Sequence, residues 1–197
     1  NLAEVLLRKS SVSKTADLSY AESADMKKYV LLIVLLSGFS ATRALSQNTH
    51  HNFDGDKAGV LPKGWKCGVT GSGAPRWEIF ADSAAVSKGN VLKQSGQGDY
   101  PWCAREDSNF LDGAVEVKFK PISGEDDQAG GVIWRFTDGN NYYVARGNAL
   151  ENNVSLYYTQ GGKRKTLKYM DAPVSKNQWN TLRVEFSGKR IRVLLNQ

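Results

Sequence analysis

The sequence predicts an all-β protein, on two observations: apolar residues alternate with a period of two, and turn residues separate the apolar runs at short intervals. The alternation is clearest at residues 115–119, 181–186 and 190–193, where every second side chain is apolar, as in a strand with one buried and one solvated face. We find no window of helical length with an apolar face. Strands at this spacing close into a sandwich or a barrel, and we expect a β-sandwich of two antiparallel sheets.

Further strands are predicted in chain order at residues 77–81, 90–94, 131–137, 141–146, 153–159 and 165–169. Turn sequences separate the later ones: Asp138-Gly139-Asn140, Gly161-Gly162 and Ser187-Gly188. The segment from residue 112 onward is therefore predicted to be a meander of hairpins. The last hairpin stops at Leu195-Asn196-Gln197, where Asn would ordinarily start another turn, so we expect the sandwich to be truncated at the C-terminus.

The N-terminal part of the chain predicts export. Residues 26–46 contain Lys27 and Lys28, an apolar run at residues 29–36 and the small-residue pattern Ala44-Leu45-Ser46, which together are typical of a secretory signal peptide. The apolar run is shorter than the roughly 18 to 20 residues of a spanning helix, so we expect no membrane span after signal cleavage. Localisation is then periplasmic or extracellular, with residues 47–197 as one β-sandwich domain.

Residues 1–25 are interpreted as an upstream segment that is not part of the mature protein. Four apolar residues in it could form one amphipathic helical turn: Leu2, Val5, Leu6 and Leu7. A single helical turn is marginal in water, and we assign this segment no function.

The charge of the mature part does not favour a nucleic-acid partner. It keeps 20 Lys or Arg and 16 Asp or Glu, a net charge of +4. Basic residues cluster at Lys163-Arg164-Lys165 with Lys168, and at Lys189-Arg190 with Arg192. Both clusters follow a glycine turn and are typical of solvated hairpins rather than of a polyanion site. Export also argues against DNA as a partner.

The cysteines and histidines limit the possible chemistry. Cys67 and Cys103 both lie in the exported part, where a disulfide is permitted and would stabilise by roughly 3 to 4 kcal/mol in the chain-entropy model. Two unpaired, small apolar side chains are the alternative. The histidines, His50 and His51, fall at the start of the mature chain, so neither zinc binding nor Cys–His catalysis is predicted.

Three segments carry a resemblance to a known group of proteins. They are Asn52-Phe53-Asp54 followed by Leu61-Pro62-Lys63-Gly64-Trp65, residues 127–135 (DQAGGVIWR), and residues 140–154 (NNYYVARGNALENNV). They resemble exported bacterial proteins with a concanavalin A-like jelly roll: laminin G-like domains and the 3-keto-disaccharide hydrolase group, a domain of unknown function related to family sixteen glycoside hydrolases. The resemblance covers nearly all of the mature part. It implies a concave sheet that carries sugar and a calcium ion at the edge of the sandwich.

Glycosidase chemistry needs two carboxylates at a defined separation, and the family sixteen arrangement Glu-x-Asp-x-x-Glu does not occur here. Glu116-Val117-Lys118 has a cation in place of the second acid, and Glu125-Asp126-Asp127 falls in a glycine-flanked turn, where a run of like charges is usually solvated. We therefore expect carbohydrate or glycoconjugate binding without catalysis. A glycoside hydrolase-like enzyme of the same group and a structural or adhesive module are the alternatives.

The candidate ligand-binding residues combine planar hydrogen-bonding groups with aromatic rings: Arg135, Asn141, Tyr143, Arg146, Asn148, Glu151, Asn153 and Trp102. Polar side chains can bind sugar hydroxyls, and rings can pack on the apolar face of a sugar. Trp102 lies in a glycine-rich polar stretch and is expected to be an exposed stacking platform. In the alternative interpretation the two arginines pair with Glu151 or another acid across strands, and Tyr143 belongs to the core.

A calcium ion is the one cofactor considered. Asp54 and Asp56 flank Gly55 and offer the oxygen ligands that a hard cation prefers. The alternative is an Asp-Gly turn. In the resembling group the partner acid comes from a last strand that this chain lacks, so the site could be incomplete.

Overall fold

The computed structural model describes residues 2–8, 48–108 and 110–197, with only the backbone described for residues 2–8. The predicted signal peptide at residues 26–46 lies outside them. Within the described part all regular structure is β, and every strand pair is antiparallel. The predicted all-β class is confirmed. No helix that could cross a lipid bilayer is present among the residues that the structure describes.

One sheet has the strand order β13-β12-β7-β1-β5-β4, with β2 also paired to β1. Its strands are β1 (Leu2–Arg8), β2 (Asn48–His51), β4 (Trp77–Ala81), β5 (Asn90–Gln94), β7 (Gly113–Lys120), β12 (Asn180–Ser187) and β13 (Arg190–Leu195). The segment at residues 2–8 is thus a strand inside this sheet, paired along its length with residues 114–120. These residues are extended and pair with neighbouring strands, so they do not form the helical turn that their apolar residues allowed.

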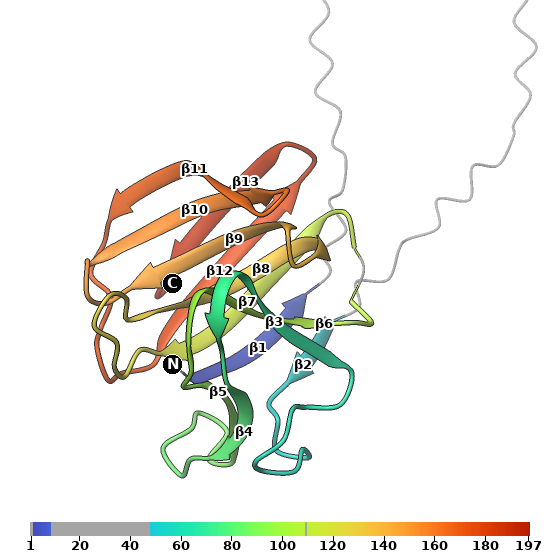
Figure 1. Cartoon of the computed structure of the whole chain (residues 1–197), viewed down its shortest axis with the longest axis vertical. Coiled ribbons are helices and arrows are strands. Elements are labelled where there is room, and N and C mark those ends of the chain that lie inside the picture. The colour runs from blue at the N-terminus through green and yellow to red at the C-terminus, as the bar shows by residue number, and fades with distance from the viewer. Residues whose placement is uncertain (1, 9–47, 109) are drawn as a thin grey trace, which may run out of the picture.

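A four-stranded sheet packs against the first one (Figure 1). It is a meander of β8 (Ala129–Asp138), β9 (Asn141–Asn148), β10 (Asn153–Gln160) and β11 (Lys163–Asp171). The core between the sheets joins alternate side chains of both, among them Val117, Phe119 and Leu182 from one and Trp134 and Ala145 from the other. The alternation of apolar residues therefore has the cause that the sequence indicated, burial of one face of each strand.

A separate two-stranded sheet crosses the outer face of the four-stranded sheet (Figure 1). It consists of β3 (Trp65–Ala74) and β6 (Gln97–Arg105), neither of which was predicted. The hydroxyl of Thr70 donates to the carbonyl of Gly139 and lies 2.8 Å from the hydroxyl of Tyr142. These bonds and an apolar cluster beneath them fix the two-stranded sheet on the four-stranded one.

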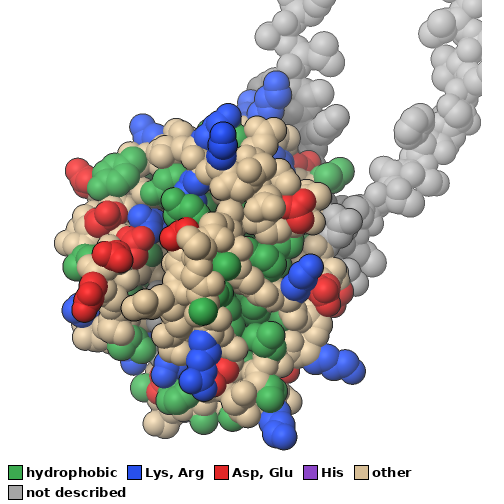
Figure 2. All heavy atoms as spheres, in the orientation of Figure 1, with side chains coloured by type: hydrophobic (Ala, Val, Ile, Leu, Met, Phe, Trp, Pro, Cys, Tyr) green, Lys and Arg blue, Asp and Glu red, His purple; other side chains and the backbone are tan. Residues whose placement is uncertain are grey.

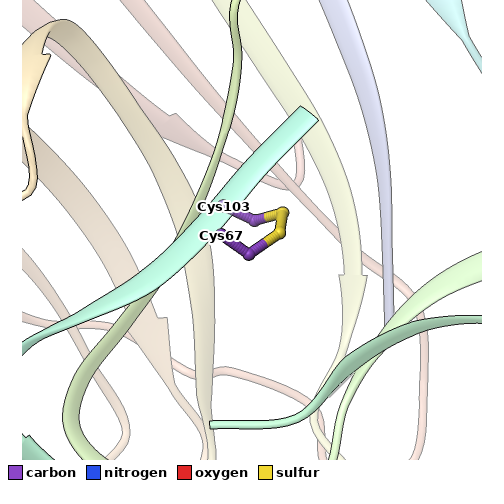
Figure 3. The surroundings of a disulfide bond; sticks show 2 residues. All are labelled: Cys67 and Cys103. Carbon is purple, nitrogen blue, oxygen red and sulfur yellow. A yellow bond between two sulfur atoms is a disulfide. The ribbon is translucent and has the colours of Figure 1, made fainter. Parts of the chain in front are cut away.

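Cys67 on β3 and Cys103 on β6 face each other across the two-stranded sheet and form a disulfide (Figure 3). The bond joins the two strands at directly paired positions and closes a loop of 36 residues. Disulfides persist in oxidising compartments, so the bond is consistent with an exported protein.

Trp102 is not an exposed platform. It is only 7% exposed and packs with Ala104, Tyr142 and Phe136 between the two-stranded sheet and the four-stranded sheet. Glycines make room for its indole, since a Cβ added at Gly68 or Gly139 would lie 2.6 Å from the ring. The expectation failed because the polar stretch around Trp102 was interpreted as a loop, whereas it is strand β6 with Trp102 on its buried face.

Candidate functional site

Polar side chains gather on the outer face of the four-stranded sheet, where β9 ends and β10 begins. We call Asp127, Arg146, Asn148, Glu151 and Asn153 the polar cluster. Arg146 and Asn148 are two residues apart on β9 and so share a face, and Asn153 on β10 is the direct partner of Asn148. Asp127 lies two residues before the start of β8, and Glu151 lies in the turn between β9 and β10. Figure 2 shows acidic side chains gathered on this side of the molecule, at the left of the view.

Hydrogen bonds tie the polar cluster together. Arg146 donates from Nη1 to Oδ2 of Asp127 at 2.6 Å, and its Nη2 lies 3.5 Å from Oε2 of Glu151. Asn148 donates to the other oxygen of Asp127 at 2.6 Å, and Asn153 donates to Glu151 at 2.7 Å. Each carboxylate is therefore held by a charged group and by an amide, which leaves its position well defined.

Burial differs sharply within the polar cluster. Asn148 and Asn153 are fully buried, whereas the side chains of Asp127 and Glu151 are 47% and 46% exposed. Burial alone lowers the pKa of Arg146, but the hydrogen bond and charge of Asp127, helped by Tyr157, outweigh it and leave that pKa raised. The guanidinium is thus a permanent cation between two carboxylates that face solvent.

Two buried polar atoms here lack a hydrogen-bond partner in the described part of the protein: Nε of Arg146 and Oε1 of the neighbouring Gln128. Buried polar atoms are usually satisfied by protein or water. These two atoms lie beneath the surface of the polar cluster, and Asp127 and Glu151 are its exposed groups.

Tyrosine rings border the polar cluster. The centroid of the Tyr157 ring lies 5.8 Å from Cζ of Arg146. Tyr169, on the edge strand β11, is exposed, and its hydroxyl accepts a hydrogen bond from Asn153 at 3.0 Å. Both rings belong to the outer face. Alternation along β10 puts Tyr157 on the same face as Asn153, and Tyr169 is paired with Ser155 on that face.

The structure brings together four of the eight predicted ligand-binding residues: Arg146, Asn148, Glu151 and Asn153. The other four lie elsewhere. Tyr143 faces the inter-sheet core, where it stacks on Trp134. Arg135 donates to the carbonyl of Gly188 at 2.7 Å, away from Arg146. Asn141 lies at the β8–β9 turn and donates a hydrogen bond to Asp138. Trp102 is buried between the two-stranded sheet and the four-stranded sheet.

Asp127, Tyr157 and Tyr169 are not among the predicted ligand-binding residues. Asp127 was interpreted as part of a solvated acidic turn, although it is the shortest ion-pair partner of Arg146. No local feature distinguishes it from Glu125 and Asp126. For Tyr157 a signal did exist, since strict alternation along residues 153–159 places it on the face of Asn153.

Asp54 and Asp56 act within the protein. Oδ1 of Asp54 accepts hydrogen bonds from the backbone of Asn90 and the hydroxyl of Ser87, and Asn52 donates to Oδ2. Asp56 pairs with His51 at 3.2 Å. Among the described residues no group of three His, Cys, Asp or Glu side chains is placed to hold a metal ion. The hydrogen bonds around Asp54 clamp the loops that it joins, and calcium binding at Asp54 and Asp56 stays a prediction.

A hollow of about 320 Å³ lies on a different surface, between β12 and β13. Its charged side chains satisfy one another: Arg183 pairs with Glu116 and Glu185, and Arg192 also pairs with Glu185. The hollow is lined by residues of β7, β12 and β13, and in the described part of the chain it has no aromatic ring beside it other than Phe186.

Comparison with models of protein families finds no match for this sequence, and comparison with curated proteins finds none. Among solved structures the chain is similar to the carbohydrate binding module CBM66 from Bacillus subtilis, with 17% sequence identity and a TM-score of 0.45. The similarity covers 68% of this chain and 74% of that one. A similarity of this degree is too low to transfer a ligand, so function must be inferred from the chain's own residues.

Proposed function

We propose that this protein is an exported carbohydrate-binding module that holds a sugar or glycoconjugate over the polar cluster, without catalysis of its own. The observation that carries the proposal is a set of donors and acceptors, held in place by one another, on a sheet face beside tyrosine rings. A sugar hydroxyl both donates and accepts hydrogen bonds. Carboxylates supply acceptors, and guanidinium and amide groups supply donors.

Preorganisation supports the same proposal. The buried amides of Asn148 and Asn153 hold Asp127 and Glu151 before any ligand arrives. Side chains that are already ordered lose little rotamer entropy on binding. A half-exposed carboxylate in a fixed position can therefore bind a hydroxyl at low entropic cost.

The finer fold assignment is also a proposal. We infer a concanavalin A-like jelly roll of the 3-keto-disaccharide hydrolase group, from the resemblance of residues 127–135 and 140–154. Two antiparallel sheets that face each other across one core are compatible with that fold.

A glycoside hydrolase is the second candidate, because Asp127 and Glu151 put two carboxylates on one surface. A carboxyl that protonates a leaving group needs surroundings that favour its neutral form. Arg146 pairs with both carboxylates, and both are about half exposed, so their surroundings do not separate an acid from a base. We therefore rank hydrolysis below binding.

A glycan array with the full chain tests both candidates. The sharpest variant is Asp127→Asn, because Arg146 and Asn148 donate to different oxygens of Asp127 and an amide keeps only one of them as an acceptor. Its matched control is Asp126→Asn on the adjacent exposed residue. We expect Asp127→Asn to weaken glycan binding by about tenfold or more, and the control to bind normally.

Mass spectrometry of the bound glycan should find it intact. Cleaved product would favour the hydrolase instead. Equal binding by the two variants would place the ligand elsewhere on the protein, and binding to no glycan on the array would contradict the proposed function.

A further inference from the structure

We propose that the glycan is anionic, and that Arg164 binds its uronate carboxylate or sulfate ester next to the polar cluster. This inference rests on the proposed function and narrows the class of ligand. It comes from a feature that the polar cluster does not use, a stacked arginine without an acidic partner.

Arg164 is held between two aromatic rings. Its Cζ lies 3.6 Å from the ring centroid of Tyr100 on β6 and 5.1 Å from that of Tyr157 on β10. Stacking fixes the plane of a guanidinium while leaving its N–H edges able to bind a planar anion in bidentate geometry. Nε of Arg164 is buried and has no hydrogen-bond partner in the described part of the protein.

The charge of Arg164 is not neutralised. Six arginines with described side chains have a carboxylate within 4.0 Å: Arg76, Arg105, Arg135, Arg146, Arg183 and Arg192. Within the same residues Arg164 and Arg190 have none. Arg190 is exposed beside a turn, where water can solvate it, whereas Arg164 is partly buried between rings. Partial burial without a counter-charge is unfavourable, and an anionic ligand would relieve it.

The neighbours of Arg164 on β11 add positive charge. Lys163, Lys165 and Lys168 are exposed, and none of them forms an ion pair with a described residue. By its sequence pattern this basic run, Lys163-Arg164-Lys165 with Lys168, is typical of a solvated hairpin. The stacking of Arg164 distinguishes one of its members from a solvated charge.

The position of Arg164 sorts the ligand by charge. Tyr157 is shared, because Arg146 and Arg164 both approach its ring, at 5.8 and 5.1 Å. Asp127 and Glu151 repel an anion from the polar cluster, so that end suits a neutral sugar. A glycan that continues across Tyr157 then brings a charged group to Arg164. The same two carboxylates disfavour a nucleic-acid backbone, which carries a negatively charged phosphate at every nucleotide.

The test compares charged and neutral forms of the same polymers. Probes are polygalacturonate against its fully methyl-esterified form, and chondroitin sulfate against its desulfated form. A single-stranded oligonucleotide serves as a general polyanion. Binding is measured by calorimetry with the full chain at low and high salt. The variants are Arg164→Gln, Arg164→Lys and the control Lys189→Gln, which removes one charge from an exposed turn.

We expect the wild type to bind one charged form at least about tenfold more tightly than its neutral counterpart. The preference should fall with salt. It should be lost in Arg164→Gln, partly kept in Arg164→Lys and unchanged in Lys189→Gln. Thermal unfolding of each variant shows whether a loss of preference reflects a loss of fold.

Four results would overturn the inference. Equal binding of charged and neutral forms would refute it and leave the proposed function standing. Equally tight binding of the oligonucleotide would mean that the surface attracts any polyanion. An unchanged preference in folded Arg164→Gln would place the charged group elsewhere. Failure to bind any glycan would refute the proposed function and this inference together.

Discussion

Asp127 should be the residue that holds Arg146 in place, and a double-mutant cycle can measure this. The perturbations are Arg146→Met, which keeps the length of the side chain without its charge, Asp127→Asn, Glu151→Gln, and the two double variants. Asp127 accepts a hydrogen bond from Arg146 at 2.6 Å, whereas Glu151 lies at 3.5 Å. The two carboxylates are similarly exposed, so geometry and not solvent screening separates the two pairs.

The magnitude follows from exposure and distance. Fully buried ion pairs lose roughly 3 to 5 kcal/mol when one partner is removed, but these carboxylates are half-exposed and the lower scale of surface pairs applies. We expect a coupling free energy of about 1 kcal/mol between Arg146 and Asp127. For Arg146 and Glu151 we expect about 0.3 kcal/mol or less, because the contact is longer.

Denaturant unfolding of the full chain, with the midpoint and slope of each variant, supplies the free energies. A coupling with Glu151 as large as that with Asp127 would refute the reasoning. So would a coupling with Asp127 that is indistinguishable from zero.

Three further predictions concern the rest of the protein. Replacing Cys67 and Cys103 together with Ser should lower the free energy of unfolding by roughly 3 to 4 kcal/mol, as expected for a loop of 36 residues, and reducing agent should then have no further effect on the melting temperature. Burial, with the charge of Arg105, lowers the pKa of His51 against the opposing effect of Asp56. His51 therefore takes up a proton less readily in the folded protein than in the unfolded chain. Stability should be fully present above about pH 6.5 and fall as the pH drops below it, and a His51→Gln variant with the same pH profile as the wild type would contradict this. N-terminal sequencing of the exported protein should begin at Gln47, since the signal peptide is predicted to end at residue 46; an N-terminus before residue 26 would refute that boundary and keep β1 in the exported chain.

Strand prediction succeeded where one face of a strand is buried. Residues 77–81 and 90–94 coincide with β4 and β5, and the hairpins from residue 113 onward differ from prediction by a few residues at their ends. It failed for β1, β2, β3 and β6. The last two are rich in glycine and polar residues and show weak alternation. These two strands are stabilised by each other, by the disulfide and by packing on the sheet, and none of those contacts is local.

Tyr143 could have been separated from the ligand-binding set on sequence alone. Tyr143 and Arg146 are three residues apart on one strand, so alternation places them on opposite faces, as the structure shows. Asn148 and Asn153 meet because the turn between them brings paired positions together. Asp127 is different, because its contact with Arg146 depends on how the connection into β8 folds over the sheet.

The sequence by itself determined the all-β class and most strands, because a period of two is a property of neighbouring residues and reflects the solvent each face meets. The tertiary structure decided which polar groups meet. Asp127 bonds to Arg146, which is 19 residues away in the sequence. Tyr100 contacts Arg164 because a separate two-stranded sheet crosses the four-stranded sheet. Trp102 is buried for that same reason. Such contacts depend on chain closure and packing between elements, which no short window of sequence encodes.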